Sequence, residues 1–267
     1  MSVLAAALLL GNSPSIAAEP VVRGRPAHAP GSVPPAPRSH HFTPHLLNPE
    51  PTPADLEFGE QQLRKMLEDR PAMKGYAIPG DPIWTRAVRG LAGDTCGYRV
   101  SWNNQDLDKP LIYPSDHAFP HPPDFKAFIR IRAAGPDGPY NGEYLWSCLF
   151  FELFNLANHH GFNAIYDKSL TGTVSREEWL TENTKLEFLA MKKMIVFYRG
   201  TWVPEMAARR IPTDPSYWKN GEKETYEEWI AQYTDEDYYP YDYWGKYYDN
   251  SIVPYLEQLK EWKKRKK

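Results

Sequence analysis

Apolar residues recur at helical spacing in residues 54–70, at the start of the region that we expect to fold. Leu56, Leu63 and Leu67 share one side of a helix, and charged residues separate them. Pro71 follows, and a proline cannot continue the backbone hydrogen bonding of a helix. The pattern therefore predicts an amphipathic helix that ends before this proline.

Short segments rich in aromatic and β-branched residues follow this helix. Residues 74–78, 98–103 and 125–133 have the composition of strands, and the last of them alternates apolar with mostly charged positions. Residues 113–124 contain four prolines and are predicted to form a loop. Together with the helices on either side, these strands predict a small antiparallel or mixed sheet and an α+β fold.

A largely apolar helix is predicted over residues 144–159. Its surface is interrupted by a narrow polar stripe, which consists of Cys148, Glu152, Asn155 and His159. A buried carboxylate is costly unless it is paired, so Glu152 requires a partner. Asn155, a tyrosine or an arginine would satisfy it and lock two helices together.

A second helix of this region is predicted to begin after Ser175. Ser175 and Glu178 have the spacing of a capping box, in which each side chain binds the other's backbone amide. Glu182 and Glu187 flank the apolar seam of this helix, which consists of Trp179, Leu186, Ala190, Met194 and Phe197. A carboxylate on one apolar helix that faces glutamates on another is also how metallohydrolases build their sites.

Residues 150–199, FFELFNLANHHGFNAIYDKSLTGTVSREEWLTENTKLEFLAMKKMIVFYR, resemble the core of zincin-type metallopeptidases. In that core a helix with the motif H-E-x-x-H is followed, after a loop, by a helix that carries a glutamate. The segment also resembles uncharacterised exported bacterial proteins that share this two-helix plan without the histidines. Glu152 matches the catalytic glutamate, whereas Phe151 and Asn155 stand at the positions of the two zinc histidines.

The resemblance implies a zincin-like helix pair that has lost its catalytic activity and has a structural or binding role. The alternative is a divergent metal-dependent hydrolase in which Glu152 is the general base. His159 and Glu187 would then complete an oxygen-rich site, which suits a harder divalent metal better than zinc. No cofactor is expected in the first case, and a divalent metal is expected in the second.

The N-terminal region has the features of an exported protein. An apolar run from Val3 to Leu10 precedes small residues, so we predict a signal peptide over residues 1–18 and a mature start near Ala18 or Glu19. No Lys or Arg precedes the run, and the alternatives are a start codon assigned too late or a segment that is not a signal. Residues 19–53 are rich in proline and are predicted to be a disordered linker. The expected location is secreted or periplasmic, in a bacterium.

The cysteines do not suggest a nucleophilic mechanism. Cys148 lies inside a predicted helix rather than at a strand-to-helix turn, and Cys96 has no histidine nearby in sequence. In an oxidising compartment Cys96 and Cys148 could form a disulfide. A buried free thiol at Cys148 is the equal alternative, because cysteines inside helices often serve as small apolar residues.

The C-terminal third is rich in aromatic residues beside carboxylates, notably from Tyr233 to Asn250. We interpret these rings mainly as a helical or irregular cover of the core, because tyrosine buries area and finds hydrogen-bond partners at its edge. The other interpretation is a carbohydrate- or peptide-binding module. Its candidate stacking residues are Trp218, Trp229, Tyr238, Tyr241 and Trp244.

Charge gives little indication of a macromolecular partner. The chain has 31 basic and 34 acidic residues and a formal net charge of −3, which argues against nucleic acid or an anionic membrane as a partner. After the N-terminal run no segment is apolar for the ~18 residues of a membrane span. We expect a single globular domain over residues 54–254 and a basic, helical or frayed tail over residues 255–267.

Overall fold

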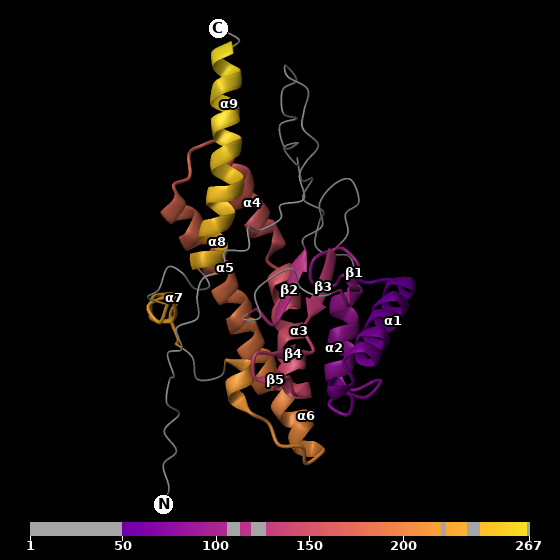
Figure 1. The fold of residues 1–267 in the computed structure, drawn as a ribbon. Helices are drawn as coiled ribbons and strands as arrows, with labels where there is room; N and C mark the ends of the chain where they lie inside the picture. The colour runs from indigo at the N-terminus through magenta and orange to yellow at the C-terminus, as the bar shows by residue number, and fades with distance from the viewer. Residues whose placement is uncertain (1–49, 106–112, 119–126, 220–222, 234–240, 266–267) are drawn as a thin grey trace, which may run out of the picture. The chain divides into compact units, whose positions relative to one another are not determined.

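The computed structural model describes residues 50–105, 113–118, 127–219, 223–233 and 241–265 (Figure 1). The chain divides into two units, residues 1–38 and 39–267, and every described residue belongs to the second. The described residues form helices and two small sheets, which confirms the α+β class. The predicted signal peptide and almost all of the predicted linker lie outside the described residues.

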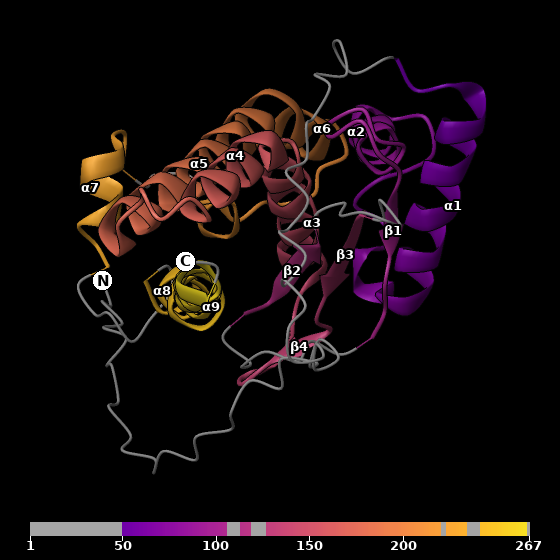
Figure 2. The same cartoon turned by 90° about the horizontal axis from the view of Figure 1, so that it is seen from above.

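Helices α1 and α2 contact the three-stranded sheet through β1, and α3 contacts it through β2 and β3 (Figures 1 and 2). The α-helices are α1 (Pro53–Asp69), α2 (Pro82–Leu91), α3 (Gly142–Leu156), α4 (His159–Ser169), α5 (Arg176–Phe197), α6 (Val203–Ala208), α7 (Tyr226–Ile230), α8 (Tyr241–Tyr247) and α9 (Val253–Arg265). The strands are β1 (Val100–Trp102), β2 (Ser115–Ala118), β3 (Ala127–Ile131), β4 (Ala134–Gly135) and β5 (Gly138–Pro139). Short 3₁₀ turns η1 (Pro71–Met73) and η3 (Pro215–Trp218) and π-helical turns η2 (Tyr198–Trp202) and η4 (Tyr248–Ile252) complete the set.

Helix α1 agrees with its prediction because its signals are local. Thr52 caps its first turn and forms a capping box with Asp55, whose side chain accepts from the Thr52 amide at 2.9 Å. The Arg99 guanidinium also binds Asp55, at 2.7 Å. Gly59 lies where α1 meets α2, and a Cβ at this position would lie 2.3 Å from the Val88 carbonyl oxygen. The close approach of the two helices therefore requires a glycine at this point.

The three-stranded sheet has the order β1-β3-β2, with β1 parallel and β2 antiparallel to β3. The side chains of β3 alternate between buried and half-buried, as its sequence predicts. The predicted strand at residues 74–78 is wrong, since only an isolated bridge joins Lys74 to Ala77. The loop predicted over residues 113–124 is wrong at β2. Pro114 precedes β2 and Pro120 follows it, so its amides remain able to pair at the edge of the sheet.

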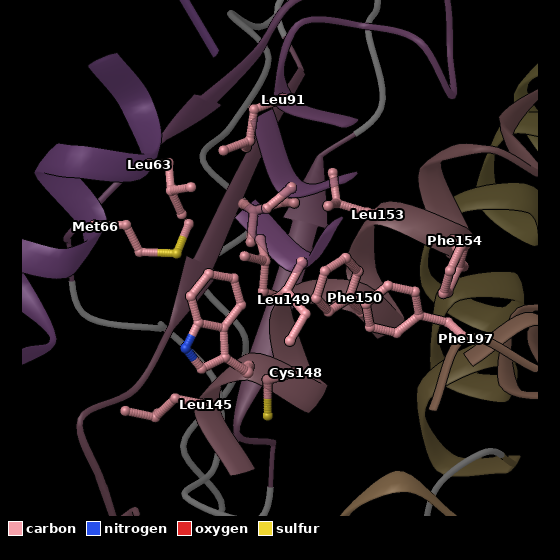
Figure 3. Packing of buried hydrophobic residues seen from close by; sticks show 14 of the residues in the cluster. Leu63, Met66, Leu91, Leu145, Cys148, Leu149, Phe150, Leu153, Phe154 and Phe197 are labelled. Atoms are coloured by element: carbon pink, nitrogen blue, oxygen red, sulfur yellow. The ribbon is translucent and has the colours of Figure 1, made fainter. Parts of the chain in front are cut away.

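Helix α3 lies at the centre of the core and is buried on almost every side. It contacts α2, α5 and strands β2 and β3. Figure 3 shows Leu63 and Met66 of α1 on one side of its apolar residues and Phe197 of α5 on the other. Because α3 is held from several sides at once, its few polar side chains are fixed in position by packing.

The polar stripe predicted for one helix over residues 144–159 is split between two helices. Helix α3 ends at Leu156, and α4 begins at His159 in a new direction. The Asn158 side chain fixes this break, because its amide donates to the Leu186 carbonyl at 2.8 Å and its oxygen accepts from Lys193 at 2.7 Å. His159 therefore does not continue the stripe that contains Glu152.

Helix α5 begins at the predicted position, but only one of the two hydrogen bonds of the predicted capping box is formed. Ser175 caps it by accepting from the Glu178 amide at 3.1 Å, and the Glu178 carboxylate accepts from Lys168 at 2.5 Å. The described part of the aromatic C-terminal third consists of short helices joined by irregular segments, and α8 packs against α5. Helix α9 carries the basic residues of the tail, and none of its residues is buried. No helix in the described part of the chain has the length and the apolar run that a membrane span requires.

Candidate functional site

Described residues of α3, β2, α4, α5, α7 and α8 and of the segments around them line a cavity of about 680 Å³. This volume lies in the range of small-molecule sites in proteins. Most of the wall is apolar or aromatic. Its charged and ionisable side chains include Asp116, His117, Glu152, Glu187 and Lys219.

Glu152 projects from the middle of α3, and both of its carboxylate oxygens are bound by β2. The Ser115 hydroxyl donates to Oε1 at 2.5 Å, and His117 Nδ1 lies 2.6 Å from Oε2. The carboxylate is buried, while the His117 side chain retains 15% of its exposure. Glu152 is therefore a partnered carboxylate, but its partners are a serine and a histidine of the sheet rather than Asn155, a tyrosine or an arginine.

The geometry of β2 explains why Ser115 and His117 reach the same carboxylate. Residues two positions apart on a strand point to the same face, so both side chains point toward α3. Asp116, between them, pairs across the sheet with Arg130, which it faces in the β2–β3 register. The guanidinium binds Asp116 at 2.9 and 2.6 Å and neutralises this carboxylate. The main acidic groups of the cavity are thus Glu152 and Glu187.

Glu187 comes from α5 and is held by an indole. Trp244 of α8 donates its Nε1 proton to Glu187 Oε1 at 3.1 Å. The Trp244 ring also stacks on Phe162 of α4, with 5.4 Å between ring centroids. The second glutamate of the predicted helix pair therefore lies in the same cavity as Glu152, and its indole partner is part of the aromatic wall.

The acidic side chains raise the pKa of other groups in the wall. Burial is the largest cause of the raised pKa of Tyr243, and the charges of Glu187, Asp116 and Glu152 raise it further. Burial also raises the pKa of the Cys148 thiol to about 12, with the charge of Glu152 as the next cause and Lys219 acting in the opposite direction. The carboxylates therefore contribute a negative potential at Tyr243 and Cys148, and Lys219 offsets part of it at Cys148.

The structure describes four of the five predicted stacking residues. Trp229 and Trp244 line the cavity. Trp218 does not, because it is fully buried in the main core and donates its Nε1 proton to Glu143 at 2.9 Å. Tyr241 packs on the edge of the cluster around Trp244, and Tyr238 lies outside the described residues. The prediction is therefore wrong for Trp218.

His159 lies apart from Glu152 and Glu187. It is fully buried, its Nδ1 lies 3.0 Å from the Leu156 carbonyl oxygen, and Tyr98 contacts its ring edge to face. It is not part of the cavity wall that the described residues form. Within that part of the chain, no three His, Cys, Asp or Glu side chains come together as a metal-binding group. The predicted ligand set of Glu152, His159 and Glu187 is therefore not assembled.

The cysteines are two separate, buried thiols. The structure thus contains the free-thiol alternative and not the disulfide between Cys96 and Cys148. Burial raises the pKa of the Cys96 thiol to about 11, and burial is also the largest cause of the raised pKa of Cys148. Cys148 lines the cavity one helical turn before Glu152, but a thiol with so high a pKa remains protonated near neutral pH and is a poor nucleophile.

Asn155, the last member of the predicted polar stripe, is buried and lines the cavity near the C-terminal end of α3. Sequence reasoning missed Ser115 and His117 as partners of Glu152. The signal was present as a serine and a histidine two positions apart in residues 113–124, but the prolines around them favoured a loop.

Sequence reasoning also missed Glu143, a second buried carboxylate of α3. It accepts from the indoles of Trp202 at 3.0 Å and Trp218 at 2.9 Å, and from the Asp214 amide at 3.0 Å. Glu143 is buried and is not part of the cavity wall that the described residues form. This carboxylate therefore joins distant segments of the chain and has a structural role.

Comparison of the chain with protein-family models, with curated proteins and with solved structures gives no match. The function must therefore be argued from the site itself. A cavity lined mainly by apolar and aromatic side chains, with carboxylates and an imidazole among them, can hold a small organic molecule.

Proposed function

We propose that the protein is a binding module whose cavity holds a small organic cation with an apolar body. The observation that carries the proposal is the combination of aromatic side chains with buried carboxylates around one cavity of about 680 Å³. The zincin-like resemblance supports a helix pair adapted to binding rather than to peptide hydrolysis, because Phe151 and Asn155 stand where zinc histidines are expected.

The aromatic side chains supply the faces that organic cations prefer. Trp179, Trp229 and Trp244 line the cavity together with several tyrosines. A cation over the face of a tryptophan is stabilised by about 0.5–2 kcal/mol, with the larger values in sites from which water is excluded. The apolar remainder of the wall accommodates the body of the ligand.

The carboxylates determine the sign of the preferred charge. The Glu152 carboxylate accepts from Ser115 and lies beside His117, the Glu187 carboxylate accepts from Trp244, and Arg130 binds Asp116. The raised pKa of Tyr243 reflects this negative potential as well as burial. A bound cation lowers the electrostatic energy of such a cavity, whereas an anion raises it.

Calorimetric titration with three ligands of similar size tests the proposal. Benzyltrimethylammonium is expected to bind more tightly than neutral benzyl alcohol, and benzoate is expected to bind weakest. Glu187→Gln keeps an acceptor for Trp244 but removes the charge, so it should weaken the cation about tenfold, which is about 1.4 kcal/mol, and leave benzyl alcohol almost unchanged. Benzoate binding as tightly as the cation would refute the proposal.

A control and a competing function are tested with the same protein. Glu182 lies on α5 outside the cavity wall and pairs with Lys185 at 3.0 Å, so Glu182→Gln should change none of the three affinities. Thermal melts with added Zn²⁺, Mn²⁺ or Ca²⁺ test the metal-dependent hydrolase, because a metal that binds only the native state raises the melting temperature. A rise that is lost in Glu152→Gln and Glu187→Gln would favour the hydrolase over the binding module.

A further inference from the structure

The pair formed by His117 and Glu152 has the geometry of a base held in place by a carboxylate. The 2.6 Å separation between His117 Nδ1 and Glu152 Oε2 is that of a strong hydrogen bond to a charged acceptor. An imidazole that donates its Nδ1 proton to a carboxylate has Nε2 as its basic nitrogen. Ser115 fixes the other oxygen of Glu152 at 2.5 Å, so the carboxylate cannot rotate away from the ring.

The location of this pair distinguishes it from a purely structural contact. Glu143, which is structural, is bound entirely within the core. In contrast, both His117 and Glu152 line the cavity, and the imidazole keeps part of its exposure there. A carboxylate that orients an imidazole within reach of a bound molecule is the arrangement used for general-base catalysis.

We propose that His117 is a general base, that Glu152 is its positioning residue, and that the organic cation is a carboxylic ester which the protein hydrolyses. The proposal rests on the cation site of the preceding subsection and adds a reaction to it. It also assigns to Glu152 a role other than that of the metallopeptidase glutamate, because here the proton is accepted by the imidazole.

The reaction consumes one water molecule and returns the pair to its starting state. His117 Nε2 takes a proton from water as the water oxygen bonds to the acyl carbon, and the carbonyl electron pair moves to the carbonyl oxygen. When that pair returns, the bond between the acyl carbon and the alcohol oxygen breaks. The imidazolium then gives its proton to the departing alkoxide, so the products are a carboxylic acid and a cationic alcohol. Glu152 stabilises the imidazolium between the two transfers.

The test uses acetylcholine as the cationic ester and 3,3-dimethylbutyl acetate as its neutral isostere, with acetate release followed by proton NMR. The parent protein is expected to hydrolyse the cationic ester with the higher kcat/KM. His117→Asn should reduce kcat at least 100-fold, because general-base catalysis contributes about 10²–10⁴ in rate. Glu152→Gln should lower kcat at least tenfold, and this loss should exceed the rise in KM, because Glu152 orients the base in addition to contributing to the negative charge of the cavity.

A surface histidine supplies the matched control. His160 is exposed and lies outside the cavity wall, so His160→Asn should leave the rate unchanged. Hydrolysis that persists in His117→Asn, or that falls equally in His160→Asn, would overturn the proposal. Binding of benzyltrimethylammonium without any ester hydrolysis would overturn it while leaving the proposed binding function in place. Absence of cation binding would overturn both.

Discussion

Replacement of Glu152 tests how the site is held together. Glu152→Ala removes the acceptor of two donors, the Ser115 hydroxyl and His117 Nδ1, which lie at 2.5 and 2.6 Å from the carboxylate. One unsatisfied buried donor costs about 1–3 kcal/mol. His117 keeps 15% of its side-chain exposure, so water can partly replace the lost acceptor. We therefore expect Glu152→Ala to lower the free energy of unfolding by about 2–3 kcal/mol.

Glu152→Gln should cost less, about 1 kcal/mol, because the amide retains the shape of the side chain and one acceptor oxygen. Urea unfolding followed by far-ultraviolet circular dichroism measures both values. With a slope of about 2 kcal/mol per molar urea, the two variants should differ in midpoint by about 0.5–1 M.

Glu182→Ala is the control for this comparison, because Glu182 is on the surface and its exposed ion pair contributes about 0–1 kcal/mol. The reasoning fails if Glu152→Gln is as destabilising as Glu152→Ala. It also fails if Glu152→Ala is as mild as the control, since the hydrogen bonds of the carboxylate would then contribute nothing to stability.

Three further predictions concern packing, pH and the thiols. Gly59→Ala should lower the melting temperature clearly, because its Cβ would lie 2.3 Å from a carbonyl oxygen of α2, whereas Gly200→Ala, with no atom within 4 Å, should not. Burial lowers the pKa of His159 from 6.5 to about 4, so the unfolded chain takes up a proton first as pH falls. Stability should therefore drop by about 3 kcal/mol between pH 6.5 and 4, at 1.36 kcal/mol per pKa unit, and His159→Phe should flatten this dependence in urea unfolding curves. Cys96 and Cys148 should react with a disulfide reagent only after denaturation, and absence of thiols in the denatured protein would show a disulfide instead.

Elements with local signals could be predicted from the sequence. The capping residue Ser175 lies next to the helix that it begins, and the alternation within residues 127–131 reflects which side chains of β3 are buried. Strand β2 could not be predicted, because it has only four residues between prolines and depends on pairing with β3. Strand pairing of this kind is specified by distant residues.

The candidate site was predictable only in part, for the same reason. The cost of a buried charge indicated that Glu152 has a partner. The partners are His117 and Ser115 of β2, 35 and 37 residues earlier in the chain, and only the position of this strand identifies them. The helix break at Asn158 depends on contacts with Leu186 and Lys193, 28 and 35 residues later. No proline or helix-ending glycine marks the break in the sequence. One continuous helix through residue 159 was therefore expected, with His159 on the same face as Glu152.

The distribution of the tryptophans provides an intrinsic fluorescence signal for the cavity. Trp146, Trp202 and Trp218 are fully buried in the main core, where a ligand in the cavity does not change their surroundings. Trp229 and Trp244 line the cavity, and Trp244 donates to Glu187. A ligand that enters should therefore quench or shift only part of the indole emission. This fraction can be followed at micromolar protein concentration without any attached dye, and it should be smaller in Trp244→Phe if the cavity is the site of binding.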